Sequence, residues 1–107
     1  MAVLVLAALA DPVRREIVEL LAAGEAGAGE IAERFPVTRP AVSRHLRVLR
    51  EAGLVRSRTE AQRRVYGVRA EPLAEVDDWL EPYRRLWARQ LDALERHLDD
   101  EAKESGP

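Results

Sequence analysis

The chain has 107 residues, 47% of them hydrophobic, which suits one globular domain over residues 1–107 rather than a disordered tail. It has no cysteine, which excludes a disulfide framework and thiolate metal sites and is compatible with a cytoplasmic location. The formal net charge is −2, and no apolar run approaches the roughly 20 residues of a membrane span, so we expect no membrane association.

The first nine residues are almost all apolar and look superficially like the core of an export signal. No positive charge precedes them, and they run directly into a helix start at Asp11 and Pro12, so a first helix is the preferred interpretation. The second helix closes at Gly24. Its apolar positions recur at helical spacing: Val13, Ile17, Leu20 and Leu21.

A helix-turn-helix unit follows. The segment Ala28–Phe35 predicts a short helix with Ile31, Ala32 and Phe35 facing inward, ended by Pro36. Thr38 as N-cap, Pro40 in the first turn and Gly53 past the end then mark a longer helix. A short helix, a brief turn and a longer basic helix are the parts of this unit.

The longer helix has two unlike faces. Val42, Leu46 and Leu49 form an apolar stripe that predicts anchoring in a core. Guanidinium forks match guanine edges and phosphates in the major groove, so the other face is a candidate DNA-reading surface; the alternative is a solvated amphipathic helix. That face carries Pro40, Ser43, Arg44 and Arg47, flanked by Arg39 and Arg50.

After Gly53 the pattern changes to a hairpin. The runs Leu54–Arg58 and Arg64–Val68 alternate in part, and the polar segment Thr59–Arg63 separates them as a predicted loop. A basic helix followed by an arginine-tipped hairpin is the layout of a winged helix-turn-helix, expected here over residues 9–69. The predicted fold class is therefore mainly α with a small β-hairpin (α+β).

The charge is spread unevenly along the chain. Residues 1–33 carry two arginines against six acids, residues 34–66 nine arginines against two acids, and residues 67–107 six basic residues against eleven acids. The balances are −4, +7 and −5, so positive charge gathers in the candidate helix and wing. This is the footprint of a DNA-binding surface on an acidic body.

The last third predicts a helical arm over residues 72–102, kinked or broken near Glu81 because Pro82 lies inside it. Its apolar stripe is too broad for so small a globule, so we expect it to join two chains; the alternative is that both tryptophans pack under the first helix. The expected dimer interface comprises Leu4, Leu6, Trp79, Leu80, Tyr83, Trp87, Leu91, Leu94 and Leu98.

The blocks DPVRREIVELL (11–21), SRHLRVLREAGLV (43–55) and RR-VY (63–66) resemble the ArsR/SmtB family of bacterial winged-helix repressors, in a subgroup without cysteine metal boxes. The resemblance implies a homodimer built on helices at both chain ends, which represses its own or a neighbouring operon until some signal relieves the repression. One departure is Ala61, near which the family commonly has glycine, so the turn type stays open. Carried over by position, the DNA contacts are Thr38, Arg39, Pro40, Ser43, Arg44, His45, Arg47, Arg63 and Arg64.

For His45, at the edge of the apolar stripe, we expect packing or a phosphate contact rather than base reading. We predict no metal site and no cofactor. The family's cysteine-based site is replaced by Glu25–Gly29, and its terminal-helix site keeps only His97 with Asp100, which a solvated helix face explains better.

Nor do we predict an enzyme. Ser43 and His45 are two apart on a helix and point about 200° away from each other, so they cannot form a catalytic pair. The function indicated is sequence-specific binding to an inverted-repeat duplex operator by a homodimeric regulator. The alternative is a winged helix whose basic face meets an acidic protein partner. The sequence does not identify the effector.

Overall fold

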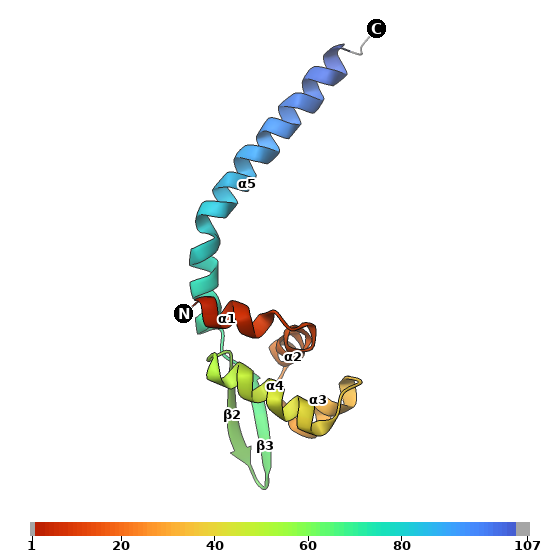
Figure 1. Ribbon diagram of the computed structural model, residues 1–107, viewed down its shortest axis with the longest axis vertical. Helices are drawn as coiled ribbons and strands as arrows, with labels where there is room; N and C mark the ends of the chain where they lie inside the picture. The colour runs from red at the N-terminus through yellow and green to blue at the C-terminus, as the bar shows by residue number, and fades with distance from the viewer. Residues whose placement is uncertain (1, 105–107) are drawn as a thin grey trace. The chain divides into compact units, whose positions relative to one another are not determined.

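The computed structural model describes residues 2–104, which divide into two structural units between Val76 and Asp77 (Figure 1). The fold is a winged helix-turn-helix, mainly helical with a small antiparallel sheet, as predicted. Its elements are α1 (Ala2–Leu9), α2 (Pro12–Ala23), β1 (Ala26–Gly27), α3 (Ala28–Arg34), α4 (Arg39–Glu51), β2 (Val55–Glu60), β3 (Arg63–Val68) and α5 (Glu71–Glu104).

The predicted helix starts are present. The Asp11 carboxylate accepts hydrogen bonds from the N–H groups of Val13 (2.8 Å) and Arg14 (3.1 Å), and the bond from Arg14 is the main cause that lowers the pKa of Asp11. The Thr38 hydroxyl accepts from the Ala41 N–H at 3.2 Å. Such caps each stabilise a helix by about 1 kcal/mol, and they fix where α2 and α4 begin.

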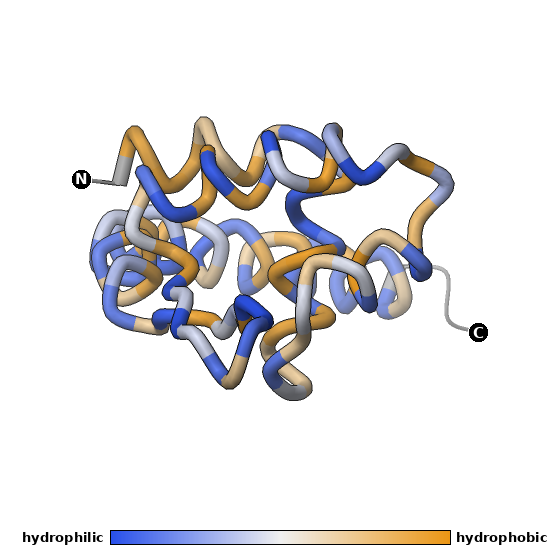
Figure 2. The backbone as a smooth tube through the Cα atoms, turned by 90° about the horizontal axis from the view of Figure 1, so that it is seen from below, coloured by the Kyte–Doolittle hydropathy of each residue, from blue (hydrophilic) through white to orange (hydrophobic). Residues whose placement is uncertain are grey.

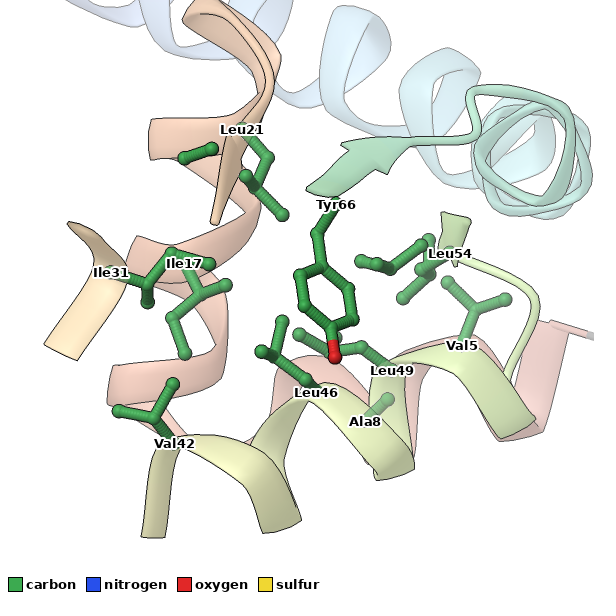
Figure 3. Packing of buried hydrophobic residues seen from close by; sticks show 12 residues of the cluster. Val5, Ala8, Ile17, Leu21, Ile31, Val42, Leu46, Leu49, Leu54 and Tyr66 are labelled. Carbon is green, nitrogen blue, oxygen red and sulfur yellow. The ribbon is translucent and has the colours of Figure 1, made fainter. Parts of the chain in front are cut away.

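The core of the first unit is built where the sequence placed its apolar stripes. Hydrophobic and hydrophilic segments alternate along the backbone in Figure 2. In α4 the buried residues recur at helical spacing and form one apolar face. Val42, Leu46 and Leu49 of α4 are each at most 1% exposed. Tyr66 from β3 points toward Leu46 and Leu49 (Figure 3). Full burial of each such side chain stabilises the fold by about 1.5–3 kcal/mol, which anchors α4 firmly.

The short helix α3 ends one residue earlier than predicted. Phe35 is extended (φ −128°, ψ 146°), because the ring of Pro36 disfavours a helical residue before it. Ile31 is fully buried, while Ala32 and Phe35 are half-buried against the core.

The hairpin differs from the prediction in its turn. β2 and β3 pair from Val55 with Val68 to Glu60 with Arg63, and the hairpin projects from the rest of the unit (Figure 1). The predicted loop Thr59–Arg63 is therefore wrong: only Ala61 and Gln62 form the turn, and the polar residues around them continue the ladder. Polar side chains are compatible with strand pairing here because this end of the hairpin is exposed.

A third strand was not predicted. β1 has two residues and pairs antiparallel with β3, Ala26 with Tyr66 and Gly27 with Val65, so the sheet order is β1-β3-β2. This strand pairs the segment before α3 with the hairpin of β2 and β3, which we call the wing.

α5 is one continuous helix from Glu71 to Glu104. Of the kink or break expected near Glu81, the break is therefore wrong, and the kink stays a prediction. Pro82 lacks the N–H that would bond the Asp78 carbonyl, but both residues are exposed, where water can serve that carbonyl. Arg84 supports this turn. Its guanidinium donates to the main-chain carbonyl of Asp77 (2.7 Å), to the Asp77 carboxylate and to Glu81 (3.0 Å).

Candidate nucleic-acid interface

The solvent face of α4 carries most of the predicted DNA contacts. Because Val42, Leu46 and Leu49 are held in the core, the residues about half a turn away must face outward. The exposed members of the predicted set on this helix and its cap are Thr38, Arg39, Pro40, Ser43, Arg44 and Arg47.

The exposed arginines of α4 differ in their surroundings. Arg47 Nε donates to Glu51 Oε1 at 3.2 Å, one turn along the same helix, and both side chains are mostly exposed. An exposed pair of this kind is worth about 0.3–0.5 kcal/mol, so it orients Arg47 without holding it. Within residues 2–104, Arg39 and Arg44 form no ion pair, so both are available to an anionic partner.

His45 lies apart from this exposed group. It is half-buried, and its Nδ1 is 3.5 Å from Nη1 of Arg14 on α2. Arg14 in turn donates from Nε to the Ala8 carbonyl at 2.6 Å. The structure therefore places His45 in the packing between α4 and α2, as the sequence pattern suggested.

The wing places Arg63 and Arg64 at the start of β3, next to the turn, and both are exposed. Arg63 Nη2 is 2.6 Å from Glu30 Oε1 in the first turn of α3. Of the described residues, none forms an ion pair with Arg64.

Two further arginines of the wing were not singled out from the sequence. Glu25 accepts from Arg56 Nη1 at 2.8 Å and from Arg58 at 3.0 and 3.2 Å. The hydrogen bonds from Arg58 and then Arg56 lower the pKa of Glu25 from 4.5 to about 2. To reach Glu25, the Arg56 guanidinium crosses β3 over Gly67, where an added Cβ would lie 2.8 Å from Arg56 Nη1. Glycine at this position leaves room for the crossing.

A polar hollow of about 490 Å³ lies between α3, the start of α4 and the wing. Its basic lining comes from Arg39, Arg63 and Arg64, and its acidic lining from Glu30 and Glu33. Basic residues from two segments, α4 and β3, thus line one opening on the surface.

The predicted dimer residues are mostly exposed. On α1, Leu4 is 57% exposed and Leu6 38%. On α5, Leu80 is half-buried, and the rings of Trp79 and Tyr83 lie in contact, with centroids 5.0 Å apart and planes tilted by 48°. We call the following set the α5 apolar face: Trp79, Leu80, Tyr83, Trp87, Leu91, Leu94 and Leu98.

Over the described part of the chain, no three His, Cys, Asp or Glu side chains gather as a metal site. His97 Nε2 lies 3.1 Å from the Glu101 carboxylate, one helical turn along the exposed surface of α5. Among residues 2–104, no helix is long and apolar enough to cross a membrane.

A helix with an exposed arginine face, held in a helix-turn-helix and followed by a basic hairpin, defines a winged helix-turn-helix DNA-binding protein. Residues 11–57 match the family described as "Bacterial regulatory protein, arsR family". The chain belongs to the ArsR family of DNA-binding transcriptional regulators, which are not enzymes.

Similar proteins cover most of the chain. The HTH-type transcriptional regulator Rv2034 of Mycobacterium tuberculosis is 44% identical over 98 residues, which is 92% of this chain and 89% of that protein. The transcriptional repressor SdpR of Bacillus subtilis is 34% identical over 73 residues, 68% of this chain and 81% of the repressor. A solved ArsR-like transcriptional regulator from Rhodococcus sp. RHA1 is 33% identical, covers 89% of this chain and 90% of its own, and superposes with a TM-score of 0.71.

Proposed function

We propose that this regulator binds an inverted-repeat duplex operator as a homodimer and represses its own gene or a neighbouring operon. The observation that carries the proposal is the two-faced α4: Val42, Leu46 and Leu49 anchor it, and Ser43, Arg44 and Arg47 face solvent. A helix fits the major groove, and arginine is the side chain that most often reads guanine there. The repressor title of the Bacillus subtilis relative supports the sign of regulation.

The proposed contacts divide by position. Arg44 and Arg47, in the middle of the exposed face, reach base edges together with Ser43. At the start of α4, contacts to the DNA phosphate backbone come from Thr38, Arg39 and Pro40. Further phosphates are bound by Arg63 and Arg64 of the wing. His45, packed beside Arg14, contacts a phosphate at the edge of the helix or none.

Selection of bound duplexes from a random pool tests DNA binding and operator symmetry together. We expect enrichment of an inverted repeat whose half-sites lie about one helical turn, ~34–36 Å, apart. A reporter under the enriched sequence then tests the sign: transcription falls when the regulator is supplied. No enrichment, together with an acidic protein that binds the basic face and is not displaced by duplex, would overturn the proposal. Increased transcription would show that the regulator is an activator and not a repressor.

A further inference from the structure

Acidic side chains neutralise most of the positive charge of the wing. Arg56 and Arg58 share the carboxylate of Glu25, and Arg63 contacts that of Glu30. Both acids lie in the short stretch that contains β1 and the first turn of α3. These two acids, which pair with three of the wing arginines, thus belong to a different segment of the chain.

The two acids hold their arginines differently. Glu25 accepts three hydrogen bonds from Arg56 and Arg58. The Arg56 side chain lies across Gly67 of β3, so the sheet itself holds Arg56 in place beside Glu25. Glu30 makes a single contact to Arg63, at 2.6 Å, and the side chains of Glu30 and Arg63 are 52% and 60% exposed. An exposed pair contributes little to stability, so the Glu30 contact can be exchanged for another anion at small cost.

We propose that Glu30 occupies on Arg63 the place that a DNA phosphate takes in the complex, and so determines how strongly the wing holds DNA of any sequence. This inference rests on the proposed function. A carboxylate and a phosphate are both acceptors for charge-assisted hydrogen bonds from a guanidinium, so the two compete for Arg63.

The surrounding hollow fits this exchange. A phosphate at its opening meets Arg39, which forms no ion pair within residues 2–104, and it gains the Arg63 guanidinium only by displacing Glu30. Arg39 is placed for this role because its guanidinium lies against Gly29, where an added Cβ would lie 2.8 Å from Nη2.

The consequence is a gain in specificity. Phosphate contacts supply nearly all of the affinity for DNA of arbitrary sequence, whereas base contacts supply discrimination. An acid that weakens one phosphate contact in each wing lowers binding to arbitrary DNA and leaves the base contacts of α4 intact. Glu30 is thus a specificity-determining residue although it touches no base.

The test measures binding to a random-sequence duplex of about 30 base pairs over a series of salt concentrations. Glu30→Gln frees Arg63, so we expect about two- to fivefold tighter binding at low salt. The slope of log affinity against log salt becomes steeper, by at most about 0.9 per bound chain, the value for one complete phosphate contact. Circular dichroism checks that the variant is folded.

Glu33→Gln is the matched control, because Glu33 lines the same hollow and, within the described residues, forms no ion pair with Arg63. It removes the same charge, so any general electrostatic effect appears in both variants. In an Arg63→Ala background, Glu30→Gln has no more effect than Glu33→Gln. This non-additivity separates a specific competition from a change of net charge.

The possible failures are distinguishable. If the wild-type chain does not bind the random duplex even at low salt, the proposed function fails. If it binds, and Glu30→Gln matches Glu33→Gln in both affinity and salt slope, only the role of Glu30 is wrong. The inference is also contradicted if Glu30→Gln raises the affinity for the random duplex equally in the wild-type and the Arg63→Ala background.

Discussion

On the exposed face of α4, the two proposed DNA contacts Arg44 and Arg47 have different surroundings. Arg47 is oriented by Glu51 at 3.2 Å, while Arg44 forms no ion pair in the described part of the chain. In the proposed complex, Arg47 exchanges its weak pair with Glu51 for a base or a phosphate, whereas Arg44 loses only water. Glu51 also repels DNA phosphates that approach Arg47, which favours a base edge as its target.

For the first prediction, replacing Arg44 and Arg47 together by alanine leaves the fold intact, since neither side chain contributes to the core. Each arginine that reads a base is worth about 1–3 kcal/mol of specific binding. We therefore expect at least tenfold weaker operator binding for the double variant in a gel-shift titration. Arg89→Ala, which removes the same charge from exposed α5, is the control. Unchanged operator affinity of the double variant would show that α4 is not the helix that contacts the bases.

Glu25 gives a prediction on acid stability. Hydrogen bonds from Arg58 and Arg56 lower its pKa from 4.5 in the unfolded chain to about 2 in the folded one. A lowered folded pKa means that the stabilisation is fully present above about pH 4.5 and is lost as the pH falls toward 2. The stability difference between the wild type and Glu25→Gln should therefore be constant above pH 5 and shrink between pH 4.5 and 2.

This pH series is measured by urea unfolding at each pH. Subtracting the variant from the wild type cancels the titration of the other acids. Because the Glu25 cluster is solvent-exposed, added salt should reduce the difference at every pH. A difference that stays the same from pH 6 to pH 2 contradicts the role assigned to Glu25.

At the scale of elements, helices were predictable where a cap and a buried stripe coincide. Asp11 and Thr38 each supply the side-chain acceptor that starts a helix, and Val42, Leu46 and Leu49 supply the face that holds one. These signals are local, so they can be read along the chain. The exposed face of α4 followed from the same stripe.

What escaped prediction depends on partners far away in the chain. β1 has only two residues and exists because β3, some 40 positions later, pairs with it. The contacts of Glu25 with Arg56 and Arg58 join residues 31 and 33 positions apart. No periodicity reports such pairs. The only available signal was that acids flank a glycine-rich stretch in a chain whose hairpin is rich in arginine.

The turn of the hairpin gives a prediction at this scale. Ala61 has φ +56°, a left-handed conformation that costs a residue with a Cβ about 1–2 kcal/mol. Glycine adopts it freely but loses more entropy on folding, so Ala61→Gly should stabilise the chain by about 0.5–1 kcal/mol. Gln62→Gly is the matched control: Gln62 has no positive φ, so only the entropy cost remains and the variant should be slightly less stable. Urea unfolding measures the stability of both variants against the wild type. A loss of stability in Ala61→Gly would show that residue 61 does not have the left-handed conformation in the turn.

At the scale of the whole molecule, charge and hydrophobicity are divided between segments. Positive charge is concentrated in residues 34–66, and residues 67–107 are acidic with a balance of −5. The α5 apolar face includes Trp87 at 61% and Leu91 at 64% exposure. Exposed hydrophobic residues repeated along an acidic helix mark an interaction surface, and its acidity excludes DNA as the partner. We propose that a second copy of the chain covers it.

A homodimer explains how so small a regulator discriminates among sequences. One α4 reads only a few base pairs, and two copies related by a two-fold axis read two half-sites about one helical turn, ~34–36 Å, apart. In the proposed dimer, affinity for the operator depends on α5 because α5 joins the two reading helices.

The last prediction tests this link by charging the α5 apolar face. Leu91→Arg places an unpaired charge from each chain in the interface, at a cost of several kcal/mol, so we expect sedimentation to show a monomer. Asp92→Arg introduces the same residue one position along, outside the apolar face, and should leave a dimer. The Leu91→Arg monomer keeps weak, salt-sensitive binding through its arginines but loses most preference for the operator, because each half-site supplies part of the base contacts. If the wild-type chain sediments as a monomer at micromolar concentration while holding its operator tightly, the α5 apolar face has another partner and recognition does not need the dimer.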